Sequence, residues 1–417
     1  METSSSGGVN PAVVKRLLQK LAQMVPQALL SLDKQIFIGR EILNRLAESD
    51  RLLLKEFVDS CLVDMRRREA SDIEIGGWGS NGLIWLRVHG LKKPVPSYGS
   101  FETLEFDILI QNLLTAAQRE LLYKDSNLDF SYHYRSDNGA VFRNRADCYF
   151  DLGALALNMR AIQTSIRDYD GFEFHPVVTS ILSLAHTKEG LVLVTGITGS
   201  GKSSTLDSVI DMNNRTVEGH IIVIASPVEF IHRSQRCIVR HREVGRDTLT
   251  FKSGTVEALR QDPDIIVIGE MRDPDTILAA LEVADSGHKV FSTLHTSSAT
   301  ESIERVIGEM PPITQDRVRN RLADILRCVI SQKLVTGVDG KRVLAKEIMV
   351  MAPSIRAAIK NNNLSEIYQM INEGAKSGMV TMEQDLISLV RRRLITQDTA
   401  LNFANNKRMM QQLLQRF

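Results

Sequence analysis

A segment near the middle of the chain combines glycines, a lysine and a serine in an order suited to holding phosphate groups. It fits the pattern GxxxxGK[ST], and its residues are Gly196, Ile197, Thr198, Gly199, Ser200, Gly201, Lys202 and Ser203, with Ser204 following. Glycines let the backbone turn tightly, so that successive N–H groups point at one anion, and a helix N-terminus adds partial positive charge. Lys202 would then reach the β- and γ-phosphates of ATP, and the Ser203 hydroxyl would bind Mg²⁺.

Two glutamates follow other apolar segments and are candidates for the remaining chemistry. Ile265–Ile268 has the composition of a buried strand, and Glu270 comes two residues later, where a carboxylate can hold Mg²⁺ directly or through water. Glu229 comes shortly after the apolar segment Ile221–Ala225 and could orient and deprotonate an attacking water. The structural alternatives are that Glu270 is a surface residue at a strand end and that Glu229 is solvated because Pro227 ends its strand.

Two histidines, His288 and His295, bracket a further apolar segment, Lys289–Leu294. His295 lies just past the end of this expected strand, where it could sense the γ-phosphate or a subunit boundary. A single histidine is often only a structural hydrogen-bonding group, so the residues by themselves leave both interpretations open.

The elements that must position these side chains alternate between strand-like and helical patterns. The apolar segments Leu191–Val194, Ile221–Ala225, Ile265–Ile268 and Lys289–Leu294 are separated by helical stretches. Strands separated by helices predict parallel βαβ units, and such sheets bind ligands at the carboxyl ends of their strands. The candidate residues follow these segments, which predicts an α/β fold with the site at one edge of the sheet.

The pattern of residues outside this region predicts several further parts. Residues 1–48 are expected to form an N-terminal extension with a helix at Val13–Met24, either as an appendage or as a docking arm. The predicted division is 1–48 extension, 49–165 smaller α+β domain, 166–176 linker, 177–350 phosphate-loop domain and 351–417 C-terminal helices. Helices are expected at Leu52–Arg68, Asn112–Tyr123, Val177–His186, Ser354–Asn361, Ser365–Glu373, Thr381–Arg392 and Thr396–Phe417. Further strands are expected at Asp72–Ile75, Leu83–Val88, Phe142–Tyr149 and Ala154–Ile162.

Composition excludes several classes of protein. The chain has 417 residues, 43% hydrophobic and 24% charged, which is typical of globular proteins and excludes a disordered or collagen-like chain. Its 51 Lys and Arg against 50 Asp and Glu disfavour dedicated nucleic-acid binding. No apolar stretch predicts a transmembrane segment, the first residues do not resemble a secretory signal, and the expected location is the cytosol. The four cysteines, without a CxxC pair, predict buried thiols rather than a zinc or redox site.

Several segments in order resemble those of one family. The stretch GITGSGKSSTL…SPVEF…HREVGRDTLTF…ALRQDPDIIVIGEMRDPDTILAALEVADSGHKVFSTLHTSSA resembles the type II/IV secretion ATPase superfamily. Within it, the type IV pilus retraction, or twitching-motility, ATPases match best over roughly residues 180–350. The segment 352–361 resembles a helical signature of that branch, and the absence of the paired-CxxC insertion common in assembly-type relatives favours retraction as well.

The resemblance implies a RecA-like ATPase domain preceded by a PAS-like domain, assembled as a hexameric ring at the cytoplasmic face of a bacterial inner membrane. By match, Lys202 and Ser203 bind phosphate and Mg²⁺, Glu229 is the general base, and Glu270 is the Mg²⁺-linked acid. His288 and His295 match the histidine box of the family. Arg143 and Arg160 match arginines that approach the γ-phosphate. The implied partner is an inner-membrane platform protein.

One short motif, at residues 225–227, departs from the family pattern. The family usually has Glu-Asp-Pro where this chain has Ala225-Ser226-Pro227. Loss of both acids removes negative charge near Mg²⁺ but leaves Glu229 and Glu270 in place, so an active enzyme is still expected. The rival interpretations are an ATPase that drives a type II or type IVB secretion or conjugation system, and a nucleotide-binding scaffold ring of low turnover. A DNA-translocating ATPase is the third, and the charge balance argues against it.

Overall fold

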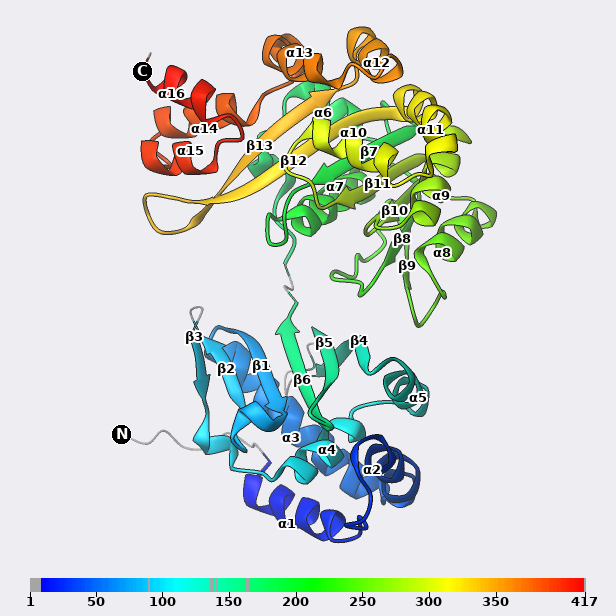
Figure 1. The fold of residues 1–417 in the computed structure, drawn as a ribbon, viewed down its shortest axis with the longest axis vertical. Helices are drawn as coiled ribbons and strands as arrows, with labels where there is room; N and C mark the ends of the chain where they lie inside the picture. The colour runs from blue at the N-terminus through cyan, green and yellow to red at the C-terminus, as the bar shows by residue number, and fades with distance from the viewer. Residues whose placement is uncertain (1–8, 89–90, 136–138, 140, 163–164, 416–417) are drawn as a thin grey trace. The chain divides into compact units, whose positions relative to one another are not determined.

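The computed structural model describes residues 9–88, 91–135, 139, 141–162 and 165–415. The chain forms two compact units, Met1–Thr164 and Ser165–Phe417, each with its own hydrophobic core (Figure 1). No helix among the described residues is both long and apolar enough to span a membrane. All four cysteines are free and buried, as the sequence predicts.

The N-terminal unit is built on an antiparallel sheet with the order β3-β2-β1-β6-β5-β4 in its described residues. Its strands are β1 (Ala70–Gly76), β2 (Trp85–Val88), β3 (Leu91–Pro94), β4 (Asn127–Arg135), β5 (Val141–Asp151) and β6 (Ala154–Ala161). Its α-helices are α1 (Pro11–Ala22), α2 (Ser31–Phe37), α3 (Glu48–Arg67), α4 (Thr103–Asn112) and α5 (Ala116–Asp125). The sequence predicts four of these strands but not β3 or β4. It places one helix at Asn112–Tyr123, where α4 ends and α5 begins.

The segment that the sequence analysis sets apart as an extension contributes to this core. In α1, Val14, Leu18 and Leu21 are buried, and they share one face of the helix at the spacing of an amphipathic helix. Ile42 and Leu43, which follow α2, are also buried in the same cluster. The first eight residues of the predicted extension lie outside the described residues.

The C-terminal unit is built on a mixed sheet with the order β13-β12-β7-β11-β10-β8-β9 in its described residues. The strands are β7 (Gly190–Thr195), β8 (Gly219–Ala225), β9 (Cys237–Glu243), β10 (Ile265–Ile268), β11 (Lys289–Leu294), β12 (Leu326–Thr336) and β13 (Arg342–Val350). All neighbours are parallel except β12 and β13, which form an antiparallel hairpin at one edge. The four predicted parallel strands are confirmed as β7, β8, β10 and β11. The sequence pattern does not predict β9, β12 or β13.

Helices connect these strands and continue past the sheet. They are α6 (Pro176–Leu182), α7 (Lys202–Thr216), α8 (Phe251–Ala258), α9 (Pro274–Asp285), α10 (Ala299–Gly308), α11 (Pro312–Ile325), α12 (Pro353–Lys360), α13 (Ile367–Glu373), α14 (Met382–Arg391), α15 (Gln397–Phe403) and α16 (Lys407–Gln415). The last three helices gather beside the β12–β13 hairpin (Figure 1) and share a small core with Val335 and Ala345 of that hairpin. The prediction of one helix over 396–417 is wrong, because the chain turns between α15 and α16, where Asn406 Oδ1 accepts a hydrogen bond from Met409 N. Residues 416 and 417 lie outside the described residues.

The segment predicted as a linker, 166–176, is partly structured. It contains the short helix η5 (Tyr169–Phe172), and Phe172 is buried. The rings of Phe172 and Phe174 stack with centroids 5.6 Å apart. Tyr169 and Phe174 of this segment pack against the core of the C-terminal unit.

Candidate functional site

The phosphate loop joins the end of β7 to the start of α7, as the sequence predicts. Gly196, Gly199 and Gly201 all have positive φ angles, of 148°, 81° and 90°, which side chains rarely permit. A Cβ on Gly196 would collide with Ser200 Oγ and would lie 2.5 Å from the carbonyl oxygen of Gln332. Around Gly199 no heavy atom comes within 4 Å of such a Cβ, so this part of the loop is open toward solvent. Tight packing on one side and open space on the other suit a backbone cradle for an anion.

Lys202 is the first residue of α7, and its side chain folds back across the loop. Nζ donates to the carbonyl oxygens of Gly196 (2.7 Å) and Ile197 (3.2 Å). Burial lowers the pKa of Lys202, while the nearby carboxylates of Glu270 and Glu229 act in the opposite direction. The two predicted acidic residues and the lysine therefore share one electrostatic site. Ser203 and Ser204 are exposed in the first turn of the same helix.

Strand β12 supports the phosphate loop from one side. Its Ser331 shares a hydrogen bond of 2.8 Å with Thr195, at the end of β7. Its Gln332 donates through Nε2 to Thr205 Oγ1 of α7, at 2.7 Å. Local sequence patterns do not reveal these supporting residues, because β12 comes more than 120 residues after the loop and its place beside β7 depends on the order of the strands.

Glu270 lies between two basic side chains beyond the end of β10. Its Oε2 lies 2.8 Å from Arg272 Nε and 3.8 Å from His295 Nε2. Burial lowers the pKa of His295, and the positive charge of Lys202 adds to that effect, while Glu270 opposes it. The neighbouring backbone is held by Thr293 Oγ1, which donates to the carbonyl oxygen of Gly269 at 2.6 Å. Arg272 was missed by the sequence analysis, although its place two residues after Glu270 is the signal that could have identified it.

His288 lies at the opposite end of β11 from His295. With about 3.3 Å per strand residue, the two histidines are roughly 20 Å apart. His288 shares a hydrogen bond of 3.0 Å with Ser286 Oγ through Nδ1. The structure thus brings His295 to the phosphate loop, at the carboxyl end of β11, and leaves His288 at the amino end of that strand.

Glu229 is exposed in the segment that follows β8 and the cis peptide bond between Ser226 and Pro227. The residue before it is anchored, because Val228 N donates to Oε2 of the buried Glu243 at 3.1 Å. Glu243 ends β9, and its backbone N–H donates in turn to Asp247 Oδ2 at 2.9 Å. Glu243 is a further residue that the sequence analysis did not single out.

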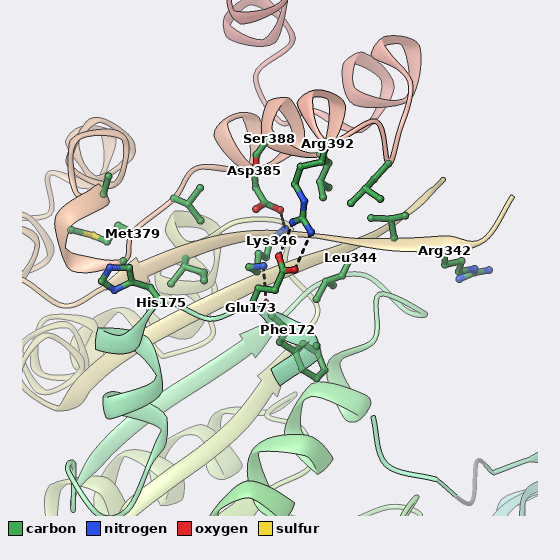
Figure 2. Close-up of a pocket in the computed structure, with 18 of the residues that line it drawn as sticks. Phe172, Glu173, His175, Arg342, Leu344, Lys346, Met379, Asp385, Ser388 and Arg392 are labelled. Carbon is green, nitrogen blue, oxygen red and sulfur yellow. Dashed lines mark hydrogen bonds and ion pairs between the residues drawn. The ribbon is translucent and has the colours of Figure 1, made fainter. Parts of the chain in front are cut away.

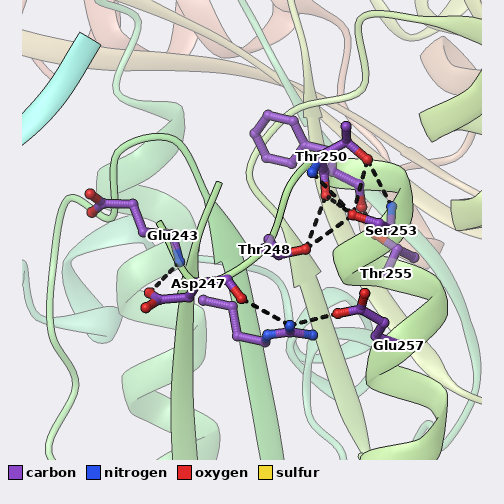
Figure 3. A network of polar contacts seen from close by, with 9 residues as sticks. Glu243, Asp247, Thr248, Thr250, Ser253, Thr255 and Glu257 are labelled. Atoms are coloured by element: carbon purple, nitrogen blue, oxygen red, sulfur yellow. Dashed lines mark hydrogen bonds and ion pairs between the residues drawn. The ribbon is translucent and has the colours of Figure 1, made fainter. Parts of the chain in front are cut away.

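The turn after β9 is held by a set of polar contacts that continues to α8 (Figure 3). Arg242 Nη2 donates to the Asp247 carbonyl oxygen at 3.1 Å and to Glu257 Oε2 at 2.6 Å. Thr250 and Ser253 form a reciprocal cap at the start of α8. These contacts fix the end of β9 and, through Glu243, the backbone beside Glu229.

Arg143 and Arg160 belong to the N-terminal unit, and each has a partner there. Arg143 Nη2 donates to Ser131 Oγ at 2.6 Å, and Arg160 Nε donates to Asp72 Oδ1 at 2.8 Å. About two thirds of the Arg160 side chain is exposed, at 66%. This leaves Arg160 accessible on the surface of its unit.

No group of three or more His, Cys, Asp or Glu side chains with the arrangement of a metal cage occurs among the described residues. A magnesium ion does not require one, because it keeps several waters and is typically held by one or two protein oxygens together with substrate phosphates. The exposed Ser203 hydroxyl and the Glu270 carboxylate fit that requirement, since they come from the loop and from the strand end beside Lys202.

The chain is similar to known proteins over most of its length. The family model for type II/IV secretion system proteins matches residues 154–408. The chain belongs to this family. Its sequence is 39% identical to a type IV pilus retraction ATPase of Pseudomonas aeruginosa over 80% of this chain and 94% of that protein. It is 36% identical to a twitching motility protein of Neisseria gonorrhoeae over 78% of this chain and 85% of that protein.

A solved structure described as the pilus retraction motor PilT with bound ADP has a similar fold. Its TM-score is 0.75 at 33% identity, and the match covers 84% of this chain and 98% of that one. This secretion-family protein is therefore an ATP hydrolase with the fold of pilus retraction ATPases, as the resemblance of the sequence implies.

Proposed function

We propose that this ATPase is a Mg²⁺-dependent motor that drives retraction of a type IV pilus. The observation that carries the proposal is the geometry of the phosphate loop, where Lys202 Nζ lies against the carbonyl oxygens of Gly196 and Ile197. Glu270 and Glu229 lie near enough for their charges to act on this ammonium group. This arrangement combines a phosphate-binding cation with two acids of different surroundings. Glu270 is largely covered and paired with Arg272, whereas Glu229 is exposed.

In the proposed mechanism the loop N–H groups and Lys202 hold the phosphates of ATP and stabilise charge on the γ-phosphoryl group. Ser203 and Glu270 would hold Mg²⁺, which when bound neutralises charge on the β- and γ-phosphate oxygens. Glu229 orients the attacking water and accepts its proton. His295, with its lowered pKa, is a neutral group beside Glu270 that can respond to the γ-phosphate.

The assembly is part of the same proposal. We take the C-terminal unit as RecA-like and the N-terminal unit as PAS-like, in a homohexameric ring on the cytoplasmic face of the inner membrane. Arg143 and Arg160 would supply positive charge to the γ-phosphate, which would couple hydrolysis to motion. An inner-membrane platform protein would turn this motion into pilin removal.

Phosphate release by the purified full chain tests the enzymatic part. Glu229→Gln should lower kcat by about 10²- to 10⁴-fold while ATP binding persists, and Lys202→Ala should remove ATP binding. Equal, near-background release by wild type and Glu229→Gln would instead support a scaffold ring of low turnover.

Deletion of the gene tests the biological part. Excess immobile surface pili support retraction, whereas loss of pili points to assembly. Normal pili with loss of protein export would support the secretion alternative. That alternative is kept because Ala225 and Ser226 stand where acids are usual in the family.

A further inference from the structure

The C-terminal unit contains a pocket away from the candidate site, and none of the residues that line it belongs to that site. Its volume is about 540 Å³, within the range of roughly 300–1,000 Å³ found for small-molecule sites. Three segments far apart in the sequence form its walls, namely residues 167–175, strand β13, and residues 375–394 with helix α14 (Figure 2).

Polar contacts between the three segments hold the pocket in shape. Arg392 makes two hydrogen bonds to the Glu173 carboxylate, at 2.6 and 2.9 Å. Lys346 of β13 donates through its backbone N–H to Asp385 Oδ2 at 2.9 Å, and through Nζ to the Phe172 carbonyl oxygen at 2.9 Å. Figure 2 shows Asp385, Arg392, Lys346 and Glu173 converging at the middle of the pocket. A cavity fixed in this way needs little rearrangement to accept a ligand.

The charges on the wall favour an anion. Arg167 and Arg342 also line the pocket and are exposed, and among the described residues neither has a carboxylate partner. The Arg167 guanidinium is instead held over the ring of Phe172, 4.9 Å from its centroid. Of the two acids on the wall, Glu173 is neutralised by Arg392. Burial raises the pKa of Asp385, although Lys346 acts in the opposite direction.

The remaining wall offers one further polar group and an apolar surface. His175 Nδ1 accepts a hydrogen bond from Val177 N, which leaves Nε2 as the donor of this ring. Leu344, Met379 and Leu389 supply apolar contacts. A ligand that uses the whole pocket therefore has an anionic end and an organic body.

We propose that this pocket binds a small organic phosphate. Guanidinium groups match the oxygens of a phosphate with paired hydrogen bonds. In the part of the chain that the structure describes, Arg167 and Arg342 have no carboxylate that occupies these donors. The apolar wall would accommodate the organic part. The site is independent of the phosphate loop, so the proposal stands or falls separately from the motor function.

Calorimetry with AMP and with inorganic phosphate tests the proposal, using the full-length Lys202→Ala variant to suppress binding at the phosphate loop. We expect AMP to bind with a Kd below about 1 mM and inorganic phosphate to bind more weakly, because it lacks the organic part. Adding Arg167→Ala and Arg342→Ala should weaken AMP binding at least about tenfold, since each removes a charged hydrogen-bond donor.

The exposed Arg317 on α11 provides a matched control, because Arg317→Ala removes the same charge outside the pocket. Circular dichroism confirms that each variant is folded. Arg342→Lys, which keeps the charge but not the fork of donors, should restore part of the affinity. Absence of AMP binding overturns the proposal. AMP binding that the two pocket substitutions leave unchanged also overturns it, since that result places AMP outside this pocket.

Discussion

His295 Nε2 lies 3.8 Å from Glu270 Oε2. Burial lowers the pKa of this imidazole, the charge of Lys202 lowers it further, and Glu270 acts in the opposite direction. A carboxylate and an ammonium group therefore act in opposite directions on the pKa of this histidine. This arrangement makes His295 a probe of both charges in the phosphate site.

The first prediction concerns the titration of His295. Glu270→Gln removes the negative charge and should lower the pKa of His295 further, whereas Lys202→Ala removes the positive charge and should raise it. An NMR titration of histidine ring signals measures both changes, with His295→Gln used to assign the signal. Shifts of the same sign in the two variants would contradict the arrangement described here.

The second prediction concerns the shape of the phosphate loop. Gly196→Ala places a methyl group against Ser200 Oγ and the Gln332 carbonyl oxygen at a positive φ angle, so we expect loss of ATP binding and lower stability. Gly308→Ala is the matched control, because Gly308 lies in α10 with nothing within 4 Å of the new Cβ. That variant should be neutral or stabilised by about 0.4–1 kcal/mol in thermal unfolding.

The third prediction concerns Glu243, which anchors the backbone next to Glu229. Glu243→Ala leaves Val228 N without its acceptor and should lower kcat about tenfold with little change in KM, because the general base is misplaced while the phosphate loop is intact. Glu243→Gln keeps an acceptor oxygen and should retain most of the activity. Steady-state kinetics measure kcat and KM of both variants. Equal losses of kcat in the two variants would show that activity depends on the charge of Glu243 rather than on its hydrogen bond to Val228.

The fourth prediction concerns the pH dependence of stability. Burial raises the pKa of Glu347 from 4.5 to about 7, and its Oε1 accepts from Ala299 N at 2.8 Å. Between these two pH values the folded state keeps a proton that the unfolded state has lost. The contribution of Glu347 to stability is therefore complete below pH 4.5 and is lost as the pH rises through 7. Its size follows from the pKa shift and is roughly 3 kcal/mol.

Glu347→Gln keeps the acceptor for Ala299 but cannot ionise. Urea unfolding at pH 5 and at pH 7.5 should show a smaller loss of stability in this variant than in the wild type. A wild type and a variant with the same dependence on pH would indicate that Glu347 is ionised in the folded protein at both values.

The parts of the site that could be predicted from the sequence are those carried by short local patterns. The phosphate loop needs only glycines, a lysine and a following helix. Glu229 and Glu270 each follow an apolar strand, and parallel strands bring their carboxyl ends together. Glu229 and Glu270 accordingly lie close enough to Lys202 for their charges to act on its ammonium group.

What the sequence did not reveal depends on contacts between distant segments. Strand β12 supports the loop only because it pairs with β7, which lies more than 120 residues earlier. Strand β9 ends in charged residues that look solvated until Glu243 is seen to bind Val228. Val14 and Leu18 suggest an amphipathic helix, but the surface that covers them is formed by residues much later in the N-terminal unit.

Two adjacent residues of β12 have consequences for building hybrids between relatives. Gln332 bonds to the helix that carries Lys202, and its neighbour Lys333 donates to the Phe403 carbonyl oxygen and to Asn405 Oδ1. Asn405 in turn donates to the Ser297 carbonyl oxygen, two residues after His295. A chimaera that exchanges the tail of the protein at residue 351 would separate Lys333 from its acceptors. A crossover point before residue 326 would transfer the strand and its tail together.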